Sequence, residues 1–166
     1  MKKFITFSNF MVLLTIMTIF FYFIPAVKIT ARGLDYSTTV NLFTATFGGS
    51  YSIRVSETAY HLHGTVNATP GLIFAFVFSI VAILLTLAKM KVKIATLFAL
   101  PFYVTSGVLV LCSSVLITTS TPTIYKYANL GGAITVGVFF CILAFLALVD
   151  FIATIAKPKQ QQPSAY

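Results

Sequence analysis

Long apolar runs alternate with shorter polar stretches along the chain. Four mostly apolar runs cover residues 4–24, 71–88, 94–117 and 130–156. A helix needs about 20 apolar residues to cross a lipid bilayer, and each run is close to that length or exceeds it. The pattern therefore predicts four membrane-spanning helices in a single domain, residues 1–156.

The polar stretch at residues 25–69 has a different pattern. Its segment TATF-GG-SYSI, residues 44–53, contains two short strand-like runs on either side of Gly48 and Gly49. Paired glycines supply the positive φ angles of a tight turn, so this segment predicts a β-hairpin. The β-branched segment STTVNLF, residues 37–43, is expected to add a strand.

The predicted hairpin needs a surface to pack on, because an isolated hairpin is only marginally stable in water. In SYSIRVS, the alternation places Tyr51, Ile53 and Val55 on one face. We expect this face to rest on the outer helix ends or on a partner protein. The expected fold class is an all-α integral membrane four-helix bundle, with a small extracellular antiparallel β-sheet between helices 1 and 2.

Composition and charge also favour a membrane protein. The chain is 58% hydrophobic and 8% charged, whereas soluble domains average about 25% charged residues. The formal net charge of +8 does not indicate nucleic-acid binding, because the basic residues flank the apolar runs. We therefore expect no nucleic-acid partner.

The positions of the lysines and arginines predict the orientation. Seven lysines border the runs on one side, at positions 2, 3, 89, 91, 93, 157 and 159. Four basic residues lie on the other side, at positions 28, 32, 54 and 126. The positive-inside rule then places both termini in the cytoplasm and loop 25–69 outside the plasma membrane. The polar tail, residues 157–166, is predicted to be disordered.

Two histidines lie in the outer stretch. His61 and His63 fall on one face of an expected strand, at a spacing that can bind a metal ion. Zinc sites use three or four ligands and no cysteine lies nearby, so a pair of surface histidines without a metal is the favoured interpretation. Together with Arg54 and Tyr60, the histidines form a candidate outward contact surface.

Asp150 is the one acidic residue within an apolar run. A carboxylate at the centre of a membrane helix costs about 2.5 to 3.5 kcal/mol, and less near the interface. Asp150 is therefore either a proton or ion site, or an interfacial residue paired with nearby lysines, and the paired role is favoured. Asn9 has a similar expected depth and could hydrogen-bond with Asp150.

Small residues recur every four positions in the fourth run, at Ala133, Gly137 and Cys141. This spacing is typical of helices that pack closely in membranes. The sequence contains no recognisable nucleophile–base pair and no complete phosphate-binding loop. We therefore expect neither an enzyme nor a bound cofactor.

Four expected helices, both termini inside and a strand-rich first outer loop together resemble the claudin-like four-helix (tetraspan) membrane proteins. The resemblance is one of topology, since the family's Trp, Gly-Leu-Trp and paired cysteines are absent from the loop. Asp35 follows Gly33 and Leu34, where the family has Trp. The resemblance implies a first outer loop folded as a small sheet above a left-handed four-helix bundle.

These features favour a non-enzymatic small membrane protein that acts by protein–protein contacts, as an accessory or assembly subunit of a membrane complex or as an adhesive element. Its expected partners are the lipid bilayer and either a membrane protein or further copies of itself. One alternative is a small transporter or ligand-binding membrane subunit that uses Asp150. A further alternative is an immunity protein against a membrane-active peptide.

Overall fold

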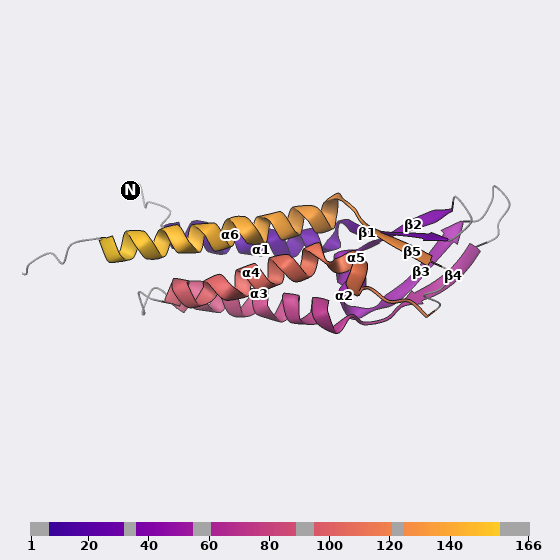
Figure 1. The fold of residues 1–166 in the computed structure, drawn as a ribbon, viewed down its shortest axis with the longest axis horizontal. Helices are drawn as coiled ribbons and strands as arrows, with labels where there is room; N and C mark the ends of the chain where they lie inside the picture. Colours follow the sequence, from indigo (N-terminus) through magenta and orange to yellow (C-terminus); the bar gives the residue numbers. More distant parts are fainter. Residues whose placement is uncertain (1–6, 32–35, 55–60, 89–94, 121–124, 157–166) are drawn as a thin grey trace, which may run out of the picture.

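The computed structural model describes residues 7–31, 36–54, 61–88, 95–120 and 125–156. Within these residues it contains six α-helices, one 3-10 helix and five β-strands. The long helices lie together at one end of the molecule and the strands lie at the other (Figure 1). We call these two regions the helical half and the β half.

The helical half is formed by long apolar helices, which are α1 (Phe7–Phe20), continued by the 3-10 helix η1 (Phe21–Phe23), α3 (Pro70–Ala88), α4 (Ala95–Leu111) and α6 (Gly131–Ala156). Helices α1 and α4 each pack against both α3 and α6. Helices α1 and α4 run towards the β half, whereas α3 and α6 run away from it (Figure 1).

The β half contains two antiparallel sheets within the described residues. The strands of the first sheet, in spatial order, are β2 (Ser37–Asn41), β1 (Pro25–Ala31) and β5 (Tyr125–Asn129). The second sheet pairs β3 (Gly49–Arg54) with β4 (His61–Val66). The short helices α2 (Leu42–Phe47) and α5 (Ser113–Leu116) lie where the two halves meet (Figure 1).

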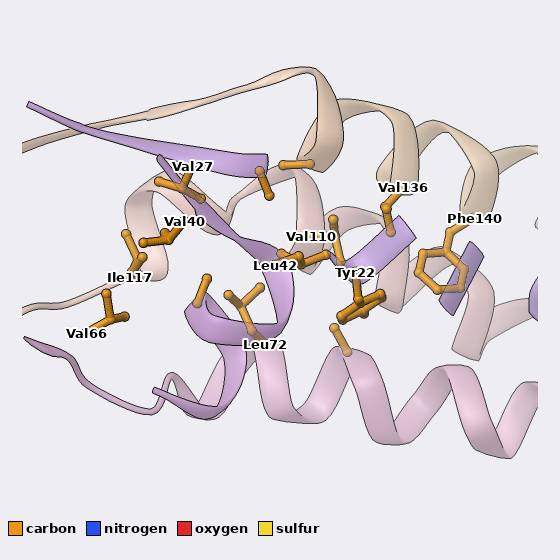
Figure 2. Close-up of a cluster of buried hydrophobic side chains, with 14 of the residues drawn as sticks. Tyr22, Val27, Val40, Leu42, Val66, Leu72, Val110, Ile117, Val136 and Phe140 are labelled. Atoms are coloured by element: carbon orange, nitrogen blue, oxygen red, sulfur yellow. The ribbon is translucent and has the colours of Figure 1, made fainter. Parts of the chain in front are cut away.

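Each sheet has one buried and one exposed face, because successive side chains on a strand point to opposite sides. In β1, Val27 and Ile29 are buried while Lys28 between them is exposed. The buried faces join the helix interior in one continuous core (Figure 2). Its labelled members are Tyr22, Val27, Val40, Leu42, Val66, Leu72, Val110, Ile117, Val136 and Phe140. The β half therefore packs directly on the helices.

The expected all-α fold class is wrong. The strands form two sheets and alternate with helices along the chain, which makes the fold a mixed α and β structure. The polar residues between the third and fourth apolar runs supply β5, and Tyr127 of β5 pairs with Ile29 of β1. This pairing joins segments about 100 residues apart. The alternation of apolar and polar residues from Val27 to Thr30 is typical of a strand, but no local pattern identifies the partner strand.

The expectation of four membrane-length helices is also wrong for the described residues, where α3 and α6 alone are long and apolar enough to cross a bilayer. Helix α4 ends at Leu111, where the side chain of Asn129 interrupts the run. The Asn129 amide nitrogen donates to the Leu111 carbonyl oxygen. The Asn129 amide oxygen accepts from the Ser113 hydroxyl at 2.8 Å and the Ser114 backbone N–H at 2.9 Å. The chain then turns into α5.

The hairpin predicted around Gly48 and Gly49 is wrong as well, because the first of its two runs is helical. Asn41 caps α2 by accepting a hydrogen bond from the Thr44 backbone N–H at 2.7 Å, and Gly48 ends the helix with a φ of 86°. An Asn cap and a terminal glycine are typical helix boundaries. The second run is β3, and its partner is β4.

Candidate functional site

The exposed side of the β3–β4 sheet carries Arg54, His61 and His63, which were predicted from the sequence to form an outward contact surface. Directly paired positions on this side are Ser50 with Thr65, Ser52 with His63, and Arg54 with His61. All six are exposed. We call these six residues the contact face. It is polar, and Arg54 and the two histidines bring positively charged or protonatable groups together at one end of it.

The opposite side of the same sheet fixes the contact face in place. Tyr51 and Ile53 are buried against the rest of the β half. The Tyr51 ring lies over Gly64, where a Cβ atom would collide with it, so glycine makes room for the ring. Tyr51 also packs edge-on against Tyr125 of β5, with ring centroids 5.6 Å apart. Burial, reinforced by the neighbouring Tyr125, raises the pKa of the Tyr51 hydroxyl.

The structure places His61 and His63 side by side, with ring centroids 6.1 Å apart. In the part of the chain that the structure describes, no group of three or more His, Cys, Asp or Glu side chains is placed to hold a metal ion. Asp35, Glu57 and the proposed contact residue Tyr60 lie outside the described residues. Both histidines lie on the contact face.

Asp150 and Asn9 lie near the end of the helical half that faces away from the sheets. Phe21 of η1, which continues α1, packs against Phe139 of α6 with ring centroids 5.5 Å apart. Asn9 in α1 and Asp150 in α6 each lie about a dozen residues, or roughly 18 Å, further from the sheets, so they are at a similar level. Asp150 is only 7% exposed, whereas Asn9 is exposed on the surface.

A cluster of hydroxyl groups lies inside the helical half, and it was not predicted from the sequence. The Tyr103 hydroxyl lies 3.1 Å from Thr15 Oγ1 and 3.0 Å from Thr86 Oγ1, so it connects α4 with α1 and α3. The Ser106 hydroxyl donates to the Ala75 carbonyl oxygen at 2.9 Å. All four of these side chains are buried. The signal in the sequence that could have indicated this cluster is the occurrence of single hydroxyl residues within the apolar runs.

The hydroxyl groups in this cluster have more possible acceptors than protons to donate. Thr15 and Thr86 each lie within 2.8 Å of a main-chain carbonyl oxygen one turn earlier, of Met11 and Ala82, to which they can donate. The Tyr103 hydroxyl has one proton, so it can donate to one of the two threonines at a time. The other threonine also has one proton, which it donates either to Tyr103 or to its own helix.

Two of the three small residues expected to allow close packing are buried in α6. Ala133 and Gly137 face the interior, whereas Cys141 is exposed. A Cβ atom at Gly137 would lie 2.5 Å from Leu111 Cγ and 3.3 Å from the Gly107 carbonyl oxygen of α4. Glycine at both positions therefore lets the α4 and α6 backbones approach closely.

No family model, no curated protein and no solved structure matches this chain. None of these comparisons tests the resemblance to the claudin-like tetraspan proteins, and a similar layout does not carry a function with it. What the protein does has to be argued from its own surfaces: the contact face, the exposed sides of the helices and the polar groups between them.

Proposed function

We propose that this is a non-enzymatic membrane protein that acts by protein–protein contacts, with its helical half in a lipid bilayer and its β half projecting from it. One observation carries the proposal: the exposed surface of the long helices is made of large apolar side chains. Leu84 on α3 is 59% exposed and Phe145 on α6 is 63% exposed. Similar residues occur along α1 and α4, namely Leu13, Met17, Phe98 and Val108.

An apolar surface of this extent is unusual on a protein surrounded by water, where exposed apolar patches seldom exceed a few hundred Å². The interior of the same helices is composed differently. Besides large apolar side chains such as Phe140, it contains many small or hydroxyl side chains, including Ala75, Ser79, Ala82, Thr86 and Ser106. Lipid chains cover large apolar side chains at no cost, and close packing of small residues then holds the helices together.

The orientation proposed for this arrangement follows from the lysines. The helix ends Ala88, Ala95 and Ala156 lie at the end of the molecule opposite to the sheets (Figure 1). In the sequence each of them borders a segment that contains lysines. By the positive-inside rule, this end faces the cytoplasm and the β half lies outside the plasma membrane.

The contact face is the surface we propose for a protein partner, which makes the protein an accessory or assembly subunit or an adhesive element. The face is exposed and held by a buried core, so it can bind without rearranging. Arg54 and the two histidines favour a partner surface that is acidic. Further copies of this chain are the other partner consistent with the proposal.

The test is a triple variant, Arg54→Ala, His61→Ala and His63→Ala, compared with the wild type after purification in mild detergent from the native membrane. We expect the variant to lose the co-purifying partner. A matched control variant, Lys28→Ala with Thr39→Ala, removes a basic and a polar exposed side chain from the paired strands β1 and β2. If the triple variant keeps the partner, or if the control variant loses it to the same extent, the contact face is not the surface that binds the partner.

A second candidate function is a small transporter or ligand-binding membrane subunit, and the burial of Asp150 favours it. The buried hydroxyls of Thr15, Thr86 and Tyr103 add polar groups to the same interior. In liposomes loaded with a pH-sensitive dye, Asp150→Asn should abolish proton movement without changing the amount of inserted protein. Equal proton movement by the wild type and the variant would exclude Asp150 from this role.

A further inference from the structure

The junction between the two halves carries a row of exposed aromatic rings. Phe43 and Phe47 lie one turn apart on α2, so they share one side of that helix. Each is 40% exposed, and Phe23 in η1 is 58% exposed. Phe23 stacks on Phe43 at a centroid distance of 5.3 Å, and Phe43 packs against Phe47 at 4.8 Å. Phe47 in turn meets Phe76 of α3 at 5.3 Å.

The other side of α2 is anchored in the core. Leu42, Ala45 and Thr46 are buried, and Leu42 lies among the core side chains shown in Figure 2. The Thr46 carbonyl oxygen accepts a hydrogen bond from the Thr69 backbone N–H at 3.0 Å, which ties α2 to the residue before α3. Helix α2 is therefore anchored on one side and exposes aromatic rings on the other, and these rings are held in fixed positions.

The position of these rings coincides with a change in the character of the surface. On the helix side of the junction the exposed side chains are apolar, as at Phe20 and Phe74. On the β side they are polar, as at Lys28 and Ser50. The change from Phe23 to Lys28 takes five residues of sequence. Because the rings continue the apolar surface of the helices up to this boundary, the occupant that fits them is lipid.

We propose that α2 is an interfacial helix, whose rings at Phe43 and Phe47, with Phe23 beside them, enter the outer leaflet between the headgroups and the acyl chains. Phenylalanine side chains on the lipid-facing side of an interfacial helix are suited to that layer. The inference rests on the proposed membrane function and adds to it. An interfacial α2 sets the depth of the protein in the membrane and holds the contact face at a fixed height above the lipid.

The chain contains no tryptophan, so a single introduced tryptophan reports on its own position. The reporters are Phe43→Trp and, as a second variant in case the first does not fold, Phe47→Trp. Two controls bracket them: Phe145→Trp on the exposed side of α6 and Ser52→Trp on the contact face. Each protein is reconstituted into phosphatidylcholine vesicles, and quenching is measured with lipids spin-labelled either near the headgroup or near the chain end.

We expect the α2 reporters to be quenched more by the label near the headgroup, Phe145→Trp to be quenched more by the deep label, and Ser52→Trp to be quenched by neither. If Phe145→Trp is quenched while both α2 reporters behave like Ser52→Trp, the rings are in water or covered by a second copy. The interfacial role then fails while membrane insertion stands. If Phe145→Trp is not quenched either, the proposed membrane location itself fails.

Discussion

The helical half and the β half of this molecule expose opposite kinds of side chain. In the β half, Ile29 is inside while Lys28 is outside. In the helical half, large apolar side chains such as Phe145 are outside, and hydroxyl residues such as Ser106 are inside together with apolar ones such as Phe140. The first surface suits water, and the second is the surface that the proposed membrane location requires.

In the proposed membrane location, each half is also stabilised by a different interaction. Burial of apolar area from water stabilises the β half, at about 25 cal/mol per Å². That force is absent between helices in lipid, where packing and hydrogen bonds between helices replace it. The close approach at Gly107 and Gly137 and the hydroxyl cluster around Tyr103 are the corresponding features here. Substitutions should therefore act differently in the two halves.

The largest expected effect comes from a charge on the outer side of the helical half. Phe145→Arg places a guanidinium near the middle of α6 and should raise the apparent free energy of membrane insertion by about 3 kcal/mol. The protein fraction that stays with alkali-washed membranes measures this. The same charge introduced by Ser52→Arg on the contact face should leave insertion unchanged. Equal insertion of both variants would contradict the division into two surroundings.

Overpacking of the α4–α6 contact should have the next largest effect. Gly137→Leu brings a side chain against Leu111 and the Gly107 carbonyl oxygen, and it should lower thermal stability in detergent by about 1 to 3 kcal/mol. Gly131→Leu in the same helix is the matched control, because a Cβ atom at Gly131 meets nothing within 4 Å among the described residues. A loss of stability in the control as large as in Gly137→Leu would show that the effect is not one of packing.

Removal of the Tyr103 hydroxyl should have a smaller effect. Tyr103→Phe deletes its contacts with Thr15 and Thr86 and should cost about 0.6 to 1.7 kcal/mol, since both threonines can still donate to their own helices. Tyr22→Phe is the control. The Tyr22 hydroxyl is buried and has no hydrogen-bond partner among the described residues, so its removal should cost nothing. Unfolding in detergent measures both changes.

The smallest expected effect is a dependence on pH confined to the β half. Burial raises the pKa of Tyr51 above its usual value of 10.0, so the folded protein holds this proton when the unfolded chain has lost it. The contribution to stability is therefore constant below about pH 10 and is lost as the pH rises above that value. Thermal unfolding of the wild type and Tyr51→Phe between neutral and alkaline pH should diverge in this range. Parallel curves would exclude the Tyr51 contribution.

Local pattern was enough to predict the faces of strands and the apolar character of the helices. Tyr51 and Ile53 lie inside, and Ser52 and Arg54 lie outside, as the alternation in SYSIRVS predicted. Helix α2 was missed because its threonines favour strands, whereas an asparagine cap at Asn41 and a glycine end fix it as a helix.

Other features depend on contacts that no local pattern contains. Strand β5 exists because it pairs with β1, which lies far away in the sequence. The end of α4 at Leu111 depends on the side chain of Asn129, eighteen positions later. The grouping of Thr15, Thr86 and Tyr103 requires the relative rotation of three helices. Sequence alone shows that each of these residues is polar and not that they meet.

The most direct test of the proposed contact function is native mass spectrometry of complexes released straight from the protein's own membrane. We expect a complex of fixed stoichiometry, with a second protein or with further copies of this chain, that the triple variant at Arg54, His61 and His63 no longer forms. A single chain carrying a bound small molecule, identical in the wild type and the variant, would contradict the contact function and support the function proposed for Asp150.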